Sequence, residues 1–135
     1  MGIFKGTVAR RKVDVVSHPA DAIMLQAMAG RGELGSEARW VHHLFFRDKA
    51  TALEAAERAE AAGWSIDWLD AQPEPFVGWV MRAGRNTVID AEQVAIARDF
   101  FEGVAGATHG KYDGWDVRPV PKHSRRRLEV PVAVA

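Results

Sequence analysis

Two adjacent histidines, His42 and His43, are the side chains that most readily suggest metal or acid–base chemistry in this chain. They lie in the run WVHHLFF, residues 40–46, which is typical of a strand buried on much of both faces. Because neighbouring strand residues point to opposite faces, the two imidazoles cannot readily bind one metal ion. The sequence has no cysteine and no HxH, HxxxH or HExxH spacing. We therefore expect no metal and no cofactor, and we interpret His43 as a hydrogen-bonded core or interface residue.

A second candidate is the stretch KYDGWDVRP, residues 111–119, in which a glycine interrupts a strand-like pattern between two aromatic residues. Tyr112, Asp113, Gly114 and Trp115 contain no nucleophile paired with a base, so a catalytic role is not expected. Glycine within a strand often marks a β-bulge, which would let Tyr112 and Trp115 share one face. This aromatic face either stabilises the fold, the commoner use of such residues, or anchors a partner.

The composition predicts one globular domain. The chain has 135 residues, of which 47% are hydrophobic and 27% charged, enough for one core. No apolar run approaches the roughly 20 residues that a transmembrane helix needs, and no export signal is evident. The lack of cysteine fits a reducing compartment. We expect a cytoplasmic protein that is not membrane-bound.

The net charge of zero hides an asymmetry along the chain. Residues 40–118 contain 8 Lys or Arg against 13 Asp or Glu, whereas the two flanks contain 10 basic and 5 acidic residues. An acidic body argues against binding to phosphate backbones and favours a protein partner with a basic patch. The alternative is that these charges only keep the protein soluble.

The order of sequence patterns predicts the elements that position these residues. An N-terminal helix is expected to begin near Pro19 and to end at Gly30 or Gly32. Strand patterns then alternate with two helices, each of which has an aspartate in the N-cap position. The predicted strands cover residues 40–46, 64–70, 76–84 and 111–119. The first of the two helices covers residues 48–63, and the second begins at Asp90 and ends near Gly106 or Gly110.

This order, βαββαβ, predicts a ferredoxin-like α+β sandwich with both helices on one face of a four-stranded antiparallel sheet. The first and third strands should be neighbours. Alternation places Trp64, Ile66 and Trp68 on one face of the second strand, and Val77, Trp79 and Met81 on one side of the third. All five tryptophans fall in predicted strands, so we expect the open face to be covered by the N-terminal helix or by a second subunit.

The sequence resembles the family of the regulator of ribonuclease E activity B, the ribonuclease E inhibitors, over roughly residues 21–119. The resemblance rests on VHHLFF before an Ala/Glu-rich helix, on a glycine–aromatic step into the next strand, and above all on YDGW in the last strand. It implies a small cytoplasmic binding protein, not an enzyme, that associates with ribonuclease E or a related ribonuclease and reduces its cleavage of RNA. It marks His43 and residues 112–115 as candidate contacts. The chain departs from the family's acidic C-terminus, since it ends PKHSRRRLEVPVAVA.

Three segments follow from this reading: an N-terminal extension (1–18), a single domain (19–119) and a basic C-terminal tail (120–135). Two alternatives stay open. The basic flanks could bind RNA, although the strands lack an RNP-like signature and RNA binding therefore ranks below protein binding. The domain could also be a ferredoxin-like homodimer, formed through its open sheet face, whose ligand is unknown.

Overall fold

The computed structural model of the protein describes residues 18–120. Within this range the helices are α2 (Pro19–Gly30), α3 (Lys49–Ala61) and α4 (Ala91–Ala107), and the strands are β1 (Glu37–Phe46), β2 (Ser65–Ala71), β3 (Trp79–Val88) and β4 (Lys111–Arg118). The predicted extension (1–18) and tail (120–135) lie outside the described residues except for His18 and Val120. No helix of the described part is long and apolar enough to cross a membrane.

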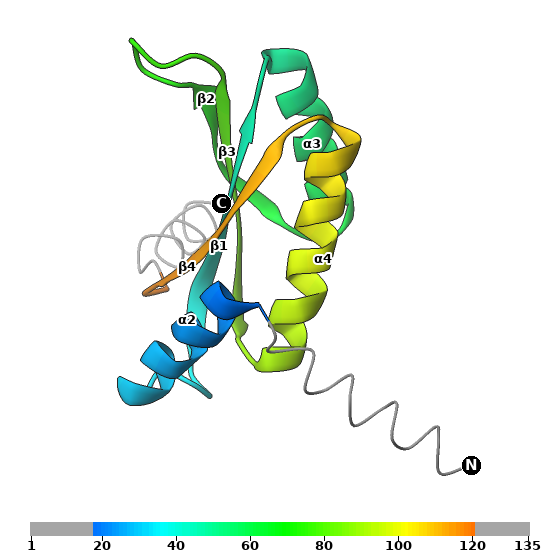
Figure 1. The fold of residues 1–135 in the computed structure, drawn as a ribbon. Coiled ribbons are helices and arrows are strands. Elements are labelled where there is room, and N and C mark those ends of the chain that lie inside the picture. The colour runs from blue at the N-terminus through cyan, green and yellow to red at the C-terminus, as the bar shows by residue number, and fades with distance from the viewer. Residues whose placement is uncertain (1–17, 121–135) are drawn as a thin grey trace, which may run out of the picture.

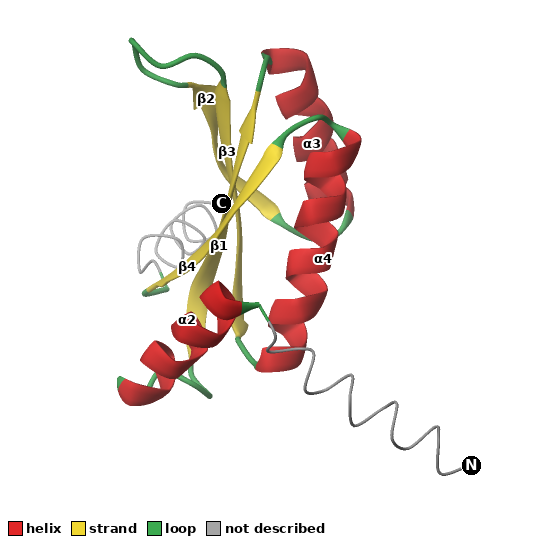
Figure 2. Ribbon diagram, viewed as in Figure 1, coloured by secondary structure: helices red, strands yellow, loops and turns green. Residues whose placement is uncertain are grey.

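The strands form one antiparallel sheet in the order β2-β3-β1-β4. Strand β1 therefore pairs with β3, as the sequence predicted, and β4 lies on its other side. Helices α3 and α4 cover the same face of the sheet and leave the other face open within the described residues (Figures 1 and 2). This arrangement confirms the α+β fold class and agrees with the ferredoxin-like order.

Both sheet-packing helices begin at the aspartates that the sequence identified. The Asp48 carboxylate accepts a hydrogen bond from the Thr51 amide at 2.9 Å, and the Asp90 carboxylate accepts one from the Gln93 amide at 2.8 Å. Each bond satisfies a backbone N–H that has no partner within the helix. The first residues of both helices are therefore fixed by local hydrogen bonds.

The core lies between the sheet and the helices. Helix α3 contributes only alanine to its buried stripe, which lets its backbone approach the sheet closely, whereas α4 contributes the large Phe101 ring. The sheet supplies Trp40, Leu44 and Met81, all of which are at most 1% exposed. The small residues of α3 thus face large strand residues, which gives the interdigitation that close packing needs.

The structure corrects two details of the strand assignment. Strand β3 begins at Trp79, so the prediction that it begins at Phe76 with Val77 on the Trp79 face was wrong. Alternation in β2 was also predicted wrongly, because a register shift between Ile66 and Trp68 inserts Asp67 as a β-bulge. Trp64 and Ile66 face the helices, but Trp68 pairs with Arg82 and is 48% exposed.

Helix α2 packs on the helix side of the sheet, not over the open face. Its Met28 belongs to the same core as Trp40 and Phe101, and its Asp21 bonds to α4 and β4. Four of the five tryptophans, Trp40, Trp64, Trp79 and Trp115, belong to or pack against this core. Of the five tryptophans, only Trp68 therefore remains for the open face.

Candidate functional site

The YDGW motif forms a β-bulge in the edge strand β4. In its pairing with β1, His42 lies opposite Trp115 and Leu44 lies opposite Tyr112, so His43 spans both Asp113 and Gly114. Gly114 has φ +92°, a conformation that side chains other than glycine rarely adopt. The extra residue turns Tyr112 and Trp115 to the same face, toward the helices, as the glycine between the two aromatics had indicated.

Tyr112 holds a buried histidine. The Tyr112 hydroxyl and the His42 Nδ1 atom are 2.8 Å apart, and His42 is completely buried. The imidazole stacks on Phe101 with a centroid distance of 4.4 Å and meets Trp64 edge-on at 4.8 Å. Burial, reinforced by the positive charges of nearby residues, lowers the His42 pKa to about 2. Burial also raises the Tyr112 pKa, so neither group changes its protonation state near neutral pH.

Trp115 belongs to a buried ionic cluster that joins three elements. Its indole Nε1 donates to the Asp21 carboxylate at 2.8 Å, and the Arg98 guanidinium binds the same carboxylate through bonds of 2.6 and 2.9 Å. Arg98 also bonds to Glu102 at 2.8 Å and lies over the Tyr112 ring. Burial by itself would raise the Asp21 pKa, but the hydrogen bonds from Arg98 and Trp115 outweigh it and hold the pKa below its usual value. The cluster fixes α2 against α4 and β4.

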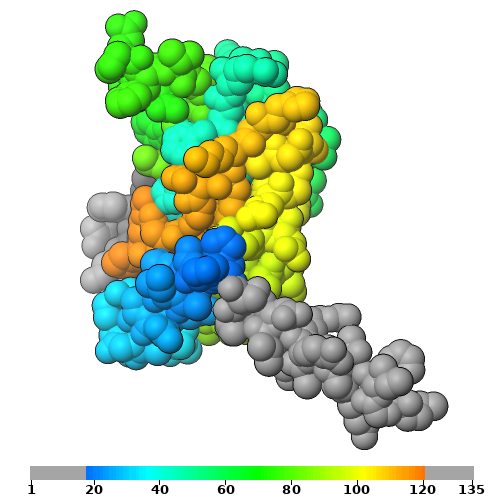
Figure 3. All heavy atoms as spheres, viewed as in Figure 1, coloured from blue at the N-terminus to red at the C-terminus, as the bar shows by residue number. Residues whose placement is uncertain are grey.

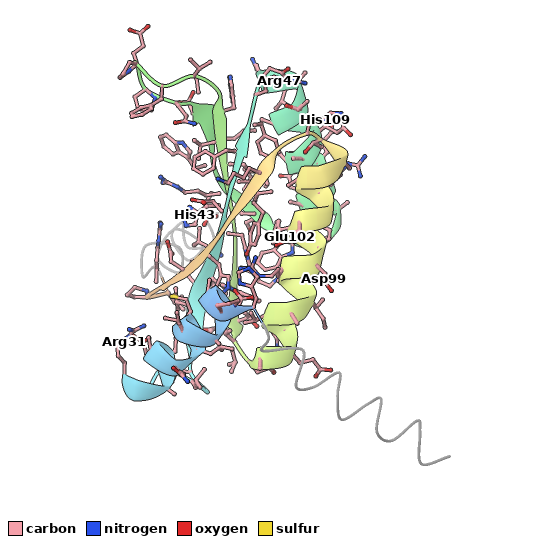
Figure 4. The ribbon with its side chains drawn as sticks, in the orientation of Figure 1. Arg31, His43, Arg47, Asp99, Glu102 and His109 are labelled. Carbon is pink, nitrogen blue, oxygen red and sulfur yellow. The ribbon has the colours of Figure 1, made fainter. Side chains whose placement is uncertain are left out.

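His43 and Asp113 lie apart from these aromatic residues. The His43 imidazole is on the sheet face away from α4 (Figure 4), where its Nε2 is 2.8 Å from Asp116 Oδ2. Asp113 is exposed at the bulge. The five motif residues therefore divide into a pair on or near the open face, His43 and Asp113, and a structural group, Tyr112, Gly114 and Trp115.

The open face carries paired charges in its centre. The Arg39 guanidinium crosses from β1 to Asp67 on the bulge of β2, with Nε 3.2 Å from the carboxylate, and also bonds to Asn86. Gly84 lies beneath this pair, because a Cβ atom there would be only 2.9 Å from Arg39 Nε. Arg82 lies over the exposed Trp68 ring. These contacts leave little unpaired charge for phosphate binding on this part of the face.

The outer surface of α3 and α4 is strongly acidic. We define the acidic helix layer as residues 48–61 and 90–107, which contain eight carboxylates and three basic side chains, a net charge of −5. All eight carboxylate residues are exposed, namely Asp48, Glu54, Glu57, Glu60, Asp90, Glu92, Asp99 and Glu102. Figure 4 shows Asp99 directed away from the sheet on the outer side of α4. Among the described residues, Glu57, Glu60, Glu92 and Asp99 form no ion pair.

A hollow of about 290 Å³ lies where the end of α3 meets α4. Trp64, Phe100 and Ile96 contribute apolar walls, and Arg85 contributes the one cationic wall. The Arg85 guanidinium is 3.9 Å from the Trp64 ring centroid and donates to the Ala62 carbonyl at 3.1 Å, at the end of α3. Arg85 thus has a structural partner on each side and caps the helix.

The described residues contain no arrangement suited to metal binding or to nucleophilic catalysis. No group of three His, Asp or Glu side chains in residues 18–120 could hold a metal ion. The two adjacent histidines point to opposite faces, and the buried one stays neutral. The geometry defines a small α+β domain whose accessible surface is rich in charge.

Comparison with known proteins places this domain in a family. A family model described as "Regulator of ribonuclease activity B" matches residues 18–117, and the chain belongs to this family. The matched range includes α2, the whole sheet except Arg118, and the YDGW motif. No curated protein matches the chain in sequence. The family is one of regulators of ribonuclease activity, as the resemblance implied.

Sequence reasoning missed the partners of the motif. Asp21 and Arg98 were not identified, because they are 77 residues apart and each reads as an ordinary surface charge. The position of Asp21 two residues after Pro19, among apolar neighbours, gave no signal of burial. His42 was not predicted to be a core residue, although its place in a continuous apolar run was consistent with a neutral, buried side chain.

Proposed function

We propose that this chain is a non-catalytic cytoplasmic protein that binds ribonuclease E, or a related ribonuclease, and reduces its cleavage of RNA. Family membership supports regulation of a ribonuclease, and the acidic helix layer supports direct binding to the protein. Six of its eight carboxylates lack an ion-pair partner in the described structure, and four of these six, Glu57, Glu60, Glu92 and Asp99, do not cap a helix either. Unpaired exposed charges of one sign attract a surface of the opposite sign and raise the association rate.

The acidic helix layer is the observation that carries this proposal. RNA would be repelled by a surface with net charge −5, whereas a basic segment of a protein would be attracted to it. The proposed partner surface is therefore rich in lysine and arginine. His43 and Asp113 are further candidate contacts, whereas Tyr112, Gly114 and Trp115 support the surface by holding β4 in its bulged form.

An inhibition assay with purified proteins tests the proposal. Wild-type protein should slow cleavage by the ribonuclease E of the same organism in proportion to the amount of ribonuclease, and independently of the RNA concentration. Inhibition that follows the RNA concentration would instead indicate that the basic flanks mask the substrate. The absence of inhibition would contradict the proposed function.

Charge reversal locates the contact. The variant Glu57→Lys/Asp99→Lys should lower the association rate by about tenfold and reduce its dependence on salt, because these carboxylates are exposed and unpaired. The matched control, Glu33→Lys/Glu37→Lys, makes the same change in net charge away from the helix layer. Equal effects of the two variants would show that total charge, not the helix layer, controls association.

The homodimer expected from the open face stays a prediction, which sedimentation of the purified chain would test.

A further inference from the structure

The loop between β2 and β3 carries two large apolar side chains into solvent. We define the apolar tip as Phe76 and Val77, which are 66% and 87% exposed. The loop projects beyond the end of the sheet, well clear of the helices (Figures 1 and 3). Neither residue belongs to or packs against the core, whereas Trp79, the first residue of β3, does. Loops are usually polar, so two adjacent apolar residues at such a tip require an explanation.

The backbone of the loop is held in one shape. The Gln72 amide donates to the Gly78 carbonyl at 2.9 Å, and the Phe76 amide donates to the Pro73 carbonyl at 3.0 Å. Gly78 has φ +110° and lies so close to β1 that a Cβ atom would be 2.7 Å from the Phe46 carbonyl oxygen. A loop that is already ordered loses little conformational entropy when it binds, which favours its use as a contact.

The charges next to the apolar tip indicate the kind of partner. Asp70 and Glu74 are exposed, and neither forms an ion pair within the described residues. Carboxylates beside an apolar anchor suit a pocket with a basic rim. The loop itself, residues 72–78, contains no lysine or arginine of the kind that favours insertion into an anionic membrane; Lys49 of α3 lies over the Trp79 ring at the base of the loop.

We propose that the apolar tip inserts into an apolar pocket with a basic rim on the protein that this domain binds. The inference rests on the proposed function, so the partner is the ribonuclease. Phe76 is the central anchor, because aromatic side chains are enriched among the residues that dominate binding energy. The acidic helix layer accelerates the encounter, and the apolar tip determines how long the complex lasts.

The variant Phe76→Ser/Val77→Ser tests this proposal with little risk to the fold, since both side chains lie outside the core. Binding of the full chain to purified ribonuclease E should weaken by about tenfold to a hundredfold, mainly through faster dissociation, with an unchanged melting temperature. The variant Ile23→Ser is the matched control, because Ile23 is also apolar and 65% exposed but lies on α2. The conservative variant Phe76→Leu should retain most of the affinity, because it keeps an apolar anchor.

The outcomes separate the two proposals. If wild type binds the ribonuclease and Phe76→Ser/Val77→Ser binds equally well, the role of the apolar tip is overturned while the proposed function stands. An equal loss of affinity in Ile23→Ser would also overturn the role of the apolar tip, since the effect would then not depend on where the exposed apolar residue lies. If wild type does not bind, both proposals fall. Binding of wild type to vesicles of mixed phosphatidylcholine and phosphatidylglycerol that is lost in Phe76→Ser/Val77→Ser would replace the protein pocket with a membrane.

Discussion

Replacing Arg98 by methionine would leave the Asp21 carboxylate buried without its cation. Asp21 is 1% exposed, and Arg98 supplies two of its three side-chain hydrogen bonds, at 2.6 and 2.9 Å. Breaking a buried ion pair on one side typically costs about 3 to 5 kcal/mol, because the remaining charge stays desolvated. We expect Arg98→Met to lower the free energy of unfolding by about that amount at pH 7. Denaturation by urea, monitored by tryptophan fluorescence, measures it.

The pH dependence distinguishes this mechanism from a simple loss of packing. In wild type the Asp21 pKa lies below its ordinary value of 3.8, so the carboxylate stabilises the fold above that pH and loses this effect only as the pH falls through the lowered pKa. Without Arg98, burial should raise the Asp21 pKa above 3.8, and protonation would then relieve the penalty. The stability difference between wild type and Arg98→Met should therefore shrink as the pH falls from 7 toward 4.

A second substitution supplies the control. In Arg98→Met/Asp21→Asn the buried charge is absent, so the double variant should be more stable than Arg98→Met alone, and the two effects should not add. A loss below about 1 kcal/mol in Arg98→Met, the size of an ordinary surface ion pair, would refute the account of a desolvated charge. A stability difference that grows as the pH falls would refute it as well.

Three further predictions concern the bulge, the buried histidine and the tail. Gly114→Ala should lower the free energy of unfolding by about 1 to 2 kcal/mol through backbone strain alone, because φ is +92° and an added Cβ would meet no atom within 4 Å. The control Gly103→Ala, on α4, has equally open space and should not destabilise the fold. Equal urea midpoints for the two variants would contradict this prediction. The His42 pKa falls from 6.5 to about 2 on folding, so below pH 6.5 the unfolded chain binds a proton that the folded chain does not. The free energy of unfolding should therefore decline by up to about 1.4 kcal/mol per pH unit below pH 6.5. His42→Phe should remove this part of the pH dependence, as measured by urea titrations across this range. Truncation after Val120 should leave the melting temperature in calorimetry nearly unchanged, whereas a drop of many degrees would show that the tail packs on the domain.

The parts of the fold that the sequence predicted well are those set by local chemistry. Asp48 and Asp90 identify helix starts because an N-cap needs only a side-chain oxygen and a free amide three residues later. Gly114 identified the bulge because Tyr112 and Trp115, three residues apart, can lie on one face of the strand only if β4 contains one extra residue between them. Neither inference requires knowledge of a distant partner.

The parts that were predicted wrongly depend on contacts between segments far apart in the chain. The bulge in β2 falls at Asp67, which is not a glycine, and it coincides with the ion pair to Arg39 across Gly84. Phe76 and Val77 have strand-like side chains, but the close approach of Gly78 to β1 delays the strand to Trp79. The same distinction explains why only part of the candidate site was predicted. The residues of the YDGW motif were identified from their own short stretch of sequence, whereas the roles of Asp21 and Arg98 depend on contacts made only in the tertiary fold.

The two bulges also affect how this protein meets copies of itself. Strands β2 and β4 are the two edges of the sheet, and each is bulged against its inner neighbour, at Asp67 in β2 and at Asp113–Gly114 in β4. A bulged edge is a poor template for a further strand, because its free N–H and C=O groups are out of step with those of a regular strand. The bulges thereby hinder the addition of further strands at both edges of the sheet, which would otherwise lead to fibrous aggregates. Partners are expected to bind side-chain surfaces instead of the backbone of an edge strand.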